Sequence, residues 1–309
     1  MTESAFLWSC ALDVAARKPG NVSLDSPGHG MQAAQFLASA QAAAAPLCRH
    51  GTPVGERIEA AVRASWNAVH CNTNLGIVLL CAPLAAAAEQ WAPQDGAGAL
   101  RLALERVLRA LDVADAAAAY RAIALARPGG LGSAPAQDVA AAPTVGLREA
   151  MALAAGRDRI AYQYVHAHAD AFERGLPTFL AAWQRASAAG ADPAGAAVHA
   201  VQAVYIDLLC TLPDSHIVRK HGAAAAHSVM SEAAPWPARI AEAGWPAFDA
   251  AFGEWDESLK ARGLNPGTTA DLSVATAFIA ALCEDSVFPR PSPAWNLKAA
   301  VMAAPGRRT

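Results

Sequence analysis

An all-α fold is predicted for this chain of 309 residues by its composition, its hydrophobic periodicity and its proline and glycine breaks. Alanine, the best helix former, dominates, whereas the strand-favouring valine, isoleucine, tyrosine and threonine are sparse. Apolar residues recur at helical spacing, as at Ile58, Val62 and Val69. We therefore expect a single compact multi-helix catalytic domain over residues 1–288, followed by a proline-rich tail over 289–309.

The expected helices follow one another with short connections. Asp112 and the Asp192-Pro193 pair are expected helix starts, because aspartate caps free N–H groups and proline fits the first turn. Residues 76–90 are nearly all apolar, which predicts a central helix buried on all sides. In chain order, helices are predicted over residues 6–17, 30–47, 56–71, 76–90, 99–110, 112–125, 147–155, 158–174, 177–189, 192–212, 215–233 and 245–262, with a last helix from 269.

The longest irregular stretch covers residues 127–143. A loop of this length within a compact domain is usually functional or disordered. It contains G-G-L-G at 129–132, which could bring backbone N–H groups against a phosphate. A plain turn is the more common reason for such a run, and neither a Walker lysine spacing nor a preceding strand accompanies it.

Charge and hydropathy argue against several classes of partner. The net charge is −3 and no run of basic residues occurs, so we expect no nucleic-acid or anionic-membrane partner. The apolar run 75–88 is too short to span a bilayer and contains Pro83, and Glu3 and Asp13 interrupt any signal peptide. The six cysteines are scattered and lack C-x-x-C spacing, which predicts free thiols in a reducing compartment. We expect a cytoplasmic protein.

Four polar segments interrupt the alanine-rich helices and suggest one composite site. The most informative is N-P-G-T-T-A-D-L at 265–272, which leads directly into an apolar helical pattern. After Asn265, the pair Pro266 and Gly267 forms a turn, and Thr268 and Thr269 supply hydroxyl groups. The free N–H groups of this helix start, including that of Gly267, can meet an anion. Asp271 either caps the helix or acts as a magnesium ligand or base.

Two of the other segments, K-P-G-N and N-T-N-L-G, also have structural alternatives. Lys18 either complements the dipole at a helix end, the more common role, or binds phosphate from a fixed turn. Asn72, Thr73 and Asn74 precede the most apolar helix. Capping needs one such residue rather than three, so ligand contact and capping are about equally supported.

The fourth segment, D-S-H-I-V-R-K-H-G, begins after a long apolar helix. Asp214 and Ser215 would make a good helix cap, which is the structural alternative. Arg219 and Lys220 follow on the next turn, and a carboxylate beside two cations suits a magnesium–polyphosphate site. His216 could supply a general acid or base.

These segments, with P-G-G-L-G…D-V and A-A-G-R-D-R-I-A, occur in an order that resembles the triphosphoribosyl-dephospho-CoA synthase family over about residues 10–285. Members are all-helical, transfer a triphosphoribosyl group from ATP to the 2′-hydroxyl of 3′-dephospho-CoA, and release adenine. The product is a prosthetic-group precursor of acyl carrier proteins. The resemblance implies site roles for Lys18, Asn72, Thr73, Asp214, Ser215, Arg219, Asn265, Pro266, Gly267, Thr268 and Asp271.

The chain departs from the family pattern at several positions. Asn74 and Leu75 replace the His-Lys that follows N-T, and His216 replaces the Asn after D-[ST]. These changes look more like a divergent branch of archaea and methylotrophic bacteria. An acceptor of the methanopterin or methanofuran type, used in one-carbon metabolism, is then an alternative.

The implied reaction displaces adenine at the anomeric carbon of ATP. It implies Mg²⁺ held by Asp214 and Asp271, phosphate contacts from Lys18, Arg219 and Lys220, and catalytic roles for both aspartates and His216. A magnesium-dependent hydrolase of ADP-ribose or a nucleotide conjugate is the alternative enzyme, and a non-enzymatic scaffold is the least favoured alternative. The expected partners are small-molecule substrates, with a homodimer as the assembly considered.

Overall fold

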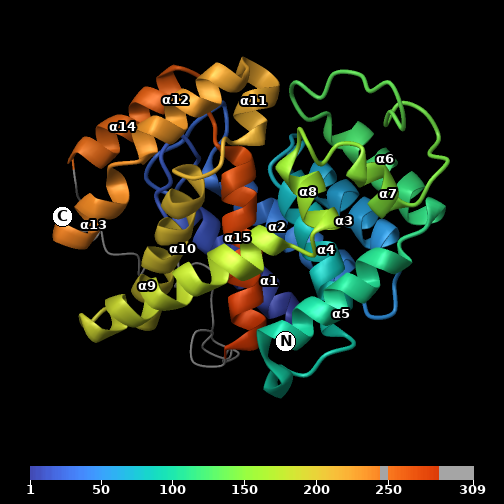
Figure 1. Cartoon of the computed structure of the whole chain (residues 1–309), viewed down its shortest axis with the longest axis horizontal. Coiled ribbons are helices and arrows are strands. Elements are labelled where there is room, and N and C mark those ends of the chain that lie inside the picture. Colours follow the sequence, from blue (N-terminus) through green and yellow to red (C-terminus); the bar gives the residue numbers. More distant parts are fainter. Residues whose placement is uncertain (244–249, 285–309) are drawn as a thin grey trace.

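The computed structural model describes residues 1–243 and 250–284. The predicted tail over 289–309 and part of the predicted helix over 245–262 lie outside the described residues. The all-α prediction is confirmed, because the described chain is 70% helical with no strands and forms one compact body (Figure 1).

The helices have the following bounds. In chain order they are α1 (Thr2–Ala15), α2 (Ala33–Leu47), α3 (Val54–Val69), α4 (Leu75–Ala88), η1 (Pro93–Asp95), α5 (Gly96–Ala110), α6 (Val113–Ala126), α7 (Leu147–Ala152), α8 (Arg159–Val165), η2 (Asp170–Gly175), α9 (Leu176–Ala188), α10 (Pro193–Leu209), α11 (Ser215–His221), α12 (Ala223–Ala233), α13 (Trp236–Ala243), α14 (Ala250–Ala261) and α15 (Gly267–Cys283).

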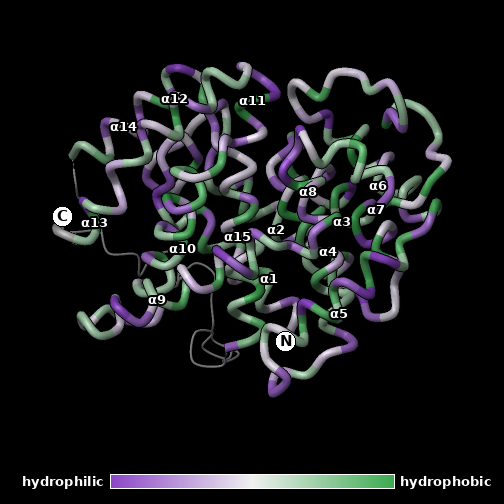
Figure 2. The backbone as a smooth tube through the Cα atoms, in the orientation of Figure 1, coloured by the Kyte–Doolittle hydropathy of each residue, from purple (hydrophilic) through white to green (hydrophobic). Residues whose placement is uncertain are grey.

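Two apolar helices, α4 and α15, form the centre of the molecule. Every residue of α4 from Leu75 to Ala87 is buried, which confirms the predicted central helix. Helix α15 is almost as completely buried and packs against α1, α4, α9 and α10 (Figure 1). Outer helices such as α5 bury one face only, and Figure 2 shows hydrophilic stretches along them. The sequence analysis identified α4 as the central helix and missed that α15 shares this place.

A proline within α4 shapes the chain that packs on it. Pro83 has no N–H, so the carbonyl of Leu79 lacks its helical donor. The Tyr164 hydroxyl donates to that carbonyl at 2.7 Å, and His168 Nε2 lies 3.0 Å from the oxygen of Leu80. Burial lowers the pKa of His168 to about 4, so its ring is neutral at physiological pH.

The prediction of one continuous helix over 158–174 is wrong, because the segment is divided into α8 and η2. Ala167 and His168 adopt φ of 46° and 52°, which ends α8 before the π-helical turn η2 begins. The predicted single helix over 215–233 is also wrong in its continuity, because Gly222 at φ 87° separates α11 from α12.

Both predicted aspartate caps are confirmed. Asp112 accepts from the N–H of Asp115 at 2.9 Å, and Asp192 accepts from the N–H of Gly195 at 2.6 Å. Each aspartate satisfies a first-turn donor that has no partner within its helix.

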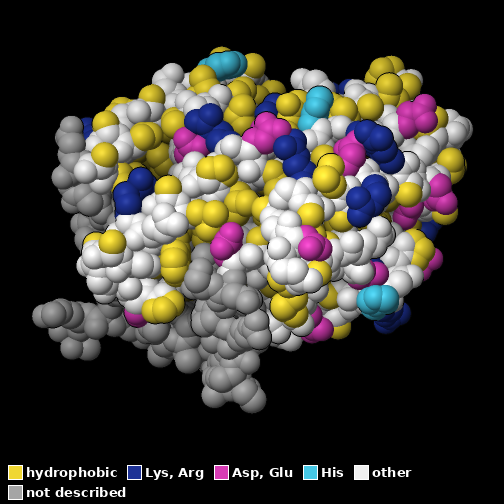
Figure 3. Space-filling view, turned by 60° about the horizontal axis from the view of Figure 1, so that its bottom comes forward, with side chains coloured by type: hydrophobic (Ala, Val, Ile, Leu, Met, Phe, Trp, Pro, Cys, Tyr) yellow, Lys and Arg dark blue, Asp and Glu magenta, His cyan; other side chains and the backbone are white. Residues whose placement is uncertain are grey.

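The surface and the cysteines agree with the composition. On the face shown in Figure 3, Lys and Arg side chains are interspersed with Asp and Glu. Among the described helices none alone could cross a membrane; Leu75–Ala88 and Pro93–Ala110 together pass by length and composition, with a bend of 100° between them. The six cysteines are free, with Cys10 and Cys81 buried and the others partly buried.

Candidate active site

All four polar segments meet at one cavity of about 560 Å³. Helices α1, α4, α8, α11 and α15 contribute to its wall, together with the loop between α6 and α7. Its polar lining comes from the four segments, and its apolar lining comes mainly from α4, α7 and the α6–α7 loop. Residues that line the cavity include Asp13, Asn21, Asn72, Thr73, Gly76, Leu79, Ile123, Gly129, Gly130, Gly132, Ser133, Met151, Arg157, Asp158, His216, Arg219, Asn265, Gly267, Thr268 and Asp271.

The structure brings most, though not all, of the predicted site residues to this cavity. Those that line it are Asn72, Thr73, His216, Arg219, Asn265, Gly267, Thr268 and Asp271. Those that do not line it are Lys18, Asn74, Asp214, Ser215 and Lys220.

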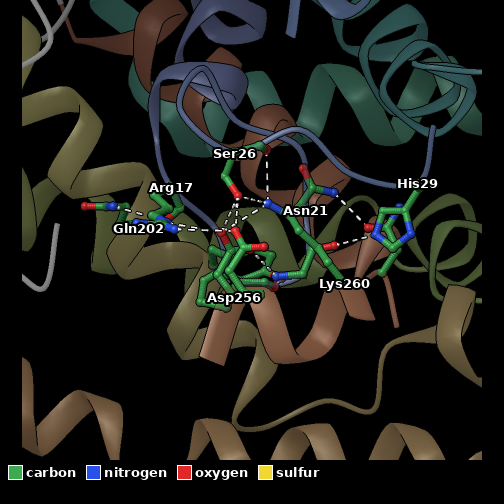
Figure 4. A network of polar contacts seen from close by, with 12 residues as sticks. Arg17, Asn21, Ser26, His29, Gln202, Asp256 and Lys260 are labelled. Atoms are coloured by element: carbon green, nitrogen blue, oxygen red, sulfur yellow. Dashed lines mark hydrogen bonds and ion pairs between the residues drawn. The ribbon is translucent and has the colours of Figure 1, made fainter. Parts of the chain in front are cut away.

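The K-P-G-N segment is a loop anchored by the buried Asp256 of α14 (Figure 4). One oxygen of Asp256 accepts from the N–H of Gly20 at 2.8 Å. The other accepts from Arg17 Nε at 3.1 Å, from the Ser26 hydroxyl at 2.8 Å and from Lys260 Nζ at 3.0 Å. Two cations and two neutral donors thus compensate the cost of burying this carboxylate.

The carbonyl groups of the same loop are also bound. Gln202 Nε2 donates to Arg17 O at 3.0 Å, the Tyr205 hydroxyl donates to Pro19 O at 2.6 Å, and His29 Nε2 lies 2.8 Å from Gly20 O. Gly20 has φ of 81°, a region that side chains with a Cβ seldom adopt. These contacts fix the loop without any ligand.

The fixed loop holds Asn21 at the cavity. Asn21 Nδ2 donates to Asn265 Oδ1 at 2.9 Å, which joins the first polar segment to the last. The Asn21 Oδ1 atom is buried and has no hydrogen-bond partner in the described chain. An unsatisfied buried acceptor in a cavity wall is suited to binding a ligand donor.

Lys18 lies behind the cavity wall rather than in it. It is fully buried, and its Nζ forms an ion pair with Asp13 Oδ1 at 2.9 Å and donates to Asp13 O. Asp13 lines the cavity, so Lys18 affects the site only indirectly, by binding and positioning this carboxylate. These contacts do not favour the predicted phosphate contact of Lys18. Asp13 was missed by the sequence analysis because no motif surrounds it in α1.

Asp271 is the exceptional carboxylate of the site. It lies in the second turn of α15, whose N-cap is Pro266, so the alternative that Asp271 caps this helix is wrong. It accepts no hydrogen bond from the described residues. A Cβ at Gly76 would lie 2.0 Å from its Oδ2, so glycine at that position makes room for it. Burial, followed by the charges of Asp13 and Asp214, raises the pKa of Asp271 well above its usual range.

Asp214 occupies a different environment. Its Oδ1 accepts from the N–H of Ile217 at 3.0 Å, and its Oδ2 accepts from the N–H and hydroxyl of Thr269, both at 2.8 Å. It therefore caps α11 and ties that helix to the first turn of α15. Burial raises the pKa of Asp214, and the hydrogen bonds from Thr269 oppose that shift. These contacts favour the structural alternative over a metal-ligand role for Asp214.

Hydroxyl groups connect the same two helices beside the cavity. The Ser215 hydroxyl lies 3.0 Å from that of Thr268 and accepts from the N–H of Arg159 at 3.1 Å. Thr268 lines the cavity, and Ser215 lies behind it. Ser215 therefore fixes the position of Thr268 and of the start of α8.

The N-T-N segment joins α4 to its neighbours. Asn72 Oδ1 accepts from the N–H of Leu75 at 3.2 Å, which caps the start of α4. The Thr73 hydroxyl donates to Ser39 at 2.6 Å, and Asn74 Nδ2 donates to the Ser65 hydroxyl at 3.0 Å. The surplus polar residues noted in the sequence are thus partly explained by contacts with α2 and α3.

Positive charge is concentrated at one side of the cavity. Arg219 Nη1 pairs with Asp158 Oδ2 at 3.0 Å, and its Nε donates to Gly129 O at 3.1 Å. Arg157 also lines the cavity, is exposed, and has no acidic partner among the described residues. Arg157 was not among the predicted site residues, although its R-D-R segment was part of the family resemblance.

His216 lies among these cations. Burial, followed by Arg219 and Lys220, lowers the pKa of His216 to about 3. Its Nδ1 would lie 2.4 Å from a Cβ at Gly267, so the glycine of N-P-G-T makes room for the ring. The imidazole is neutral at physiological pH, so it can donate or accept a hydrogen bond but cannot act as a cationic acid.

Comparison with known proteins gives these contacts a family context. Residues 2–289 match the sequence family CitG, described as ATP:dephospho-CoA triphosphoribosyl transferase. A solved structure from Archaeoglobus fulgidus, named as a triphosphoribosyl-dephospho-CoA synthase, is similar with a TM-score of 0.59 and 24% identity. The match covers 81% of this chain and 99% of that one, and at this identity it bears on the fold alone. No match was found among curated proteins. The chain belongs to the ATP:dephospho-CoA triphosphoribosyl transferase family.

Proposed function

We propose that the cavity binds ATP and a dephospho-CoA-type acceptor and transfers the triphosphoribosyl group between them. The observation that carries the proposal is Asp271, a carboxylate in the cavity wall that accepts no hydrogen bond from the described residues and whose pKa is raised. Strongly perturbed carboxylates in clefts are typical of catalytic sites. The family match favours transfer over the hydrolase, one-carbon transferase and scaffold alternatives.

The cavity has a positively charged side and an apolar side, and the two substrates differ in the same way. The triphosphate of ATP needs positive charge, which Arg157 and Arg219 offer. The uncharged arm of the acceptor needs an apolar surface with few charges, which Leu79, Ile123 and Met151 offer. We therefore place the reacting ribose between these sides, next to Asp271.

The reaction breaks the bond between C1′ of the ATP ribose and N9 of adenine. A new bond forms between C1′ and the 2′-oxygen of the acceptor, whose proton must be removed as adenine leaves with a proton. A carboxylate with a raised pKa is suited to accept a proton near neutral pH, and its charge stabilises a cationic ribosyl centre. We assign this role to Asp271, with Asp13 beside it.

Asn21 and His216 have supporting roles in this proposal. The unpaired Asn21 Oδ1 can accept a hydrogen bond from a ribose hydroxyl. His216 is neutral, so it can bond to the leaving base without carrying positive charge. Asp214 acts indirectly, by holding the first turn of α15 on which Asp271 depends.

Magnesium bound to ATP is compatible with the carboxylates present. Mg²⁺ in nucleotide sites usually takes one or two protein carboxylates, with phosphate and water oxygens completing its shell. Asp271 and Asp13 line the cavity and can meet this need, whereas both oxygens of Asp214 are already bonded. Within the described residues no group of three or more His, Cys, Asp or Glu side chains could hold a metal ion without the substrate. The bound ion would neutralise phosphate charge.

The proposal is tested by incubating the protein with ATP, Mg²⁺ and 3′-dephospho-CoA. We expect free adenine by chromatography and, by mass spectrometry, an acceptor enlarged by one triphosphoribosyl group. Asp271→Asn should reduce adenine release by at least about a hundredfold, because proton transfer commonly contributes that much. Asp25→Asn is the matched control, since Asp25 is exposed and outside the cavity lining.

Three outcomes would contradict parts of this proposal. Full adenine release by a folded Asp271→Asn variant would remove Asp271 from the chemistry. Adenine release without an acceptor would indicate hydrolysis. No turnover with ATP under any acceptor would reject the transferase. Substrates of this kind are also consistent with the proposed cytoplasmic location, and sedimentation would test the proposed homodimer.

A further inference from the structure

The glycine-rich segment 129–133, between α6 and α7, forms part of the cavity wall. Gly130 and Gly132 have φ of 73° and 65°, so neither position readily accepts a residue with a Cβ. The backbone N–H groups of Gly129, Gly130, Gly132 and Ser133 donate no hydrogen bond to the described residues. These four N–H groups are therefore available to bind a ligand, and the proposed reaction assigns them no role.

The segment is held in place at both ends. Arg219 Nε binds Gly129 O at 3.1 Å on the α11 side. On the other side, Asp138 accepts from Ala134 N at 2.5 Å and from Ala140 N at 2.8 Å, and the Tyr120 hydroxyl donates to Gln137 O at 2.7 Å. The hydrogen bonds from Ala140 and Ala134 lower the pKa of Asp138, which keeps it ionised in this role. The amides are therefore presented by a loop that needs little further ordering.

Cations surround the segment. A Cβ at Gly129 would meet Lys220 Cε at 3.2 Å, so Lys220 lies against this glycine although it does not line the cavity. Arg219 contacts the same residue, and Arg157 faces the cavity without an acidic partner in the described chain. Free amides beside three cations form an environment for an anion with several phosphate groups.

We propose that segment 129–133 binds the phosphate chain of the nucleotide through its backbone N–H groups, beside the phosphate contacts of Arg157 and Arg219. The identification of that chain as the triphosphate of ATP rests on the proposed function. The binding of a linear polyphosphate does not rest on it. Arg219 has two tasks here, since it orders the loop through Gly129 and adds its charge to the site.

The direct test is calorimetric titration of the protein with inorganic tripolyphosphate. We expect Arg157→Gln to weaken tripolyphosphate binding by at least about tenfold, the loss expected for one charge-assisted contact. We expect a similar loss for Gly130→Ala, whose added Cβ would lie 2.7 Å from Arg219 O and displace the loop. Adenosine, which has no phosphate, should bind both variants as it binds the wild type.

Matched controls separate the proposed role from general effects of charge and glycine replacement. Arg106→Gln removes an exposed arginine of α5 that lies outside the cavity, and Gly51→Ala places alanine at φ of 69° with nothing within 4 Å. Both should bind tripolyphosphate like the wild type, and circular dichroism should show that all four variants are folded.

The outcomes also separate this proposal from the proposed function. Wild-type affinity in folded Arg157→Gln and Gly130→Ala, or no tripolyphosphate binding by the wild type, would overturn the phosphate loop while leaving adenine release intact. Loss of binding in both variants would support the loop, even if no adenine were released from ATP.

Discussion

The hydrogen bond from Tyr164 to the proline-containing helix α4 allows a quantitative test of how a buried backbone carbonyl obtains its donor. Pro83 leaves the carbonyl of Leu79 without its helical donor, and the buried Tyr164 hydroxyl replaces that donor at 2.7 Å. Tyr164→Phe keeps the ring and removes the hydroxyl, which leaves a buried carbonyl unsatisfied. The expected loss is about 1–3 kcal/mol in the free energy of unfolding.

The same carbonyl can be satisfied in another way, which makes the prediction specific. Pro83→Ala restores an N–H that can bond to Leu79 O within the helix. In that background Tyr164→Phe should cost only about 0.5 kcal/mol, so the two substitutions should be coupled by about 0.5–2.5 kcal/mol. The cycle cancels the packing lost with the proline ring, because that loss occurs in both Pro83→Ala proteins.

The assay is urea unfolding of the four proteins of this cycle, followed by circular dichroism and by tryptophan fluorescence. Coincident transitions would support a two-state analysis. Tyr120→Phe is the control, because its partner, Gln137 O, lies in an accessible loop where water can replace the hydroxyl. Equal costs of Tyr164→Phe in the two backgrounds would refute the reasoning.

Three further predictions concern the site and its supporting loop. The pKa of Asp271 is raised in the folded protein, so the contribution of this carboxyl to the free energy of unfolding falls as pH rises above about 4. We therefore expect Asp271→Asn to be more stable than the wild type at pH 7 and to lose that advantage at lower pH. The lowered pKa of His216 has the opposite sign: stability is lost as pH falls below about 6.5, and His216→Gln should avoid about 1–2 kcal/mol of the loss between pH 7 and 5. Gly20→Ala should destabilise more than Gly30→Ala by about 1–3 kcal/mol, since the first Cβ would lie 2.7 Å from Leu264 O and the second meets nothing within 4 Å.

Chemical unfolding at several pH values measures the first two effects, and thermal unfolding at pH 7 measures the third. A pH profile for Asp271→Asn parallel to that of the wild type would show that this carboxyl titrates normally. Equal acid sensitivity of His216→Gln and wild type would show the same for His216. Similar costs for Gly20→Ala and Gly30→Ala would mean that the K-P-G-N loop can move away from the segment between α14 and α15.

The features that depend on local sequence were predictable. The caps at Asp112 and Asp192 follow from residue type and the start of an apolar pattern, and both form as expected. The buried helix α4 follows from an uninterrupted apolar run. The break at Ala167 and His168 has no such signal, because it follows from how the chain meets the α4 carbonyls.

The candidate site was predictable as a set of segments but not as a set of contacts. Motif order identified the segments that converge on the cavity, including Asp271. It could not separate Asp271, which accepts no hydrogen bond within residues 1–243 and 250–284, from Asp214, whose oxygens accept hydrogen bonds from Ile217 and Thr269. Asp13 was missed because its role depends on packing of α1 against distant residues rather than on its own neighbours in sequence.

The anchoring of the K-P-G-N loop by Asp256 also bears on when the site can form during synthesis. The loop is made before its anchor, because Asp256 lies 236 residues after Gly20 in sequence. Helices α1 to α13 are therefore made before the K-P-G-N loop can be anchored, and contacts of this sequence separation form slowly. We expect nascent chains that end before α14 to be helical yet to lack both Asp256 and Asn265, so that nucleotide binding begins only after residue 265 has been made.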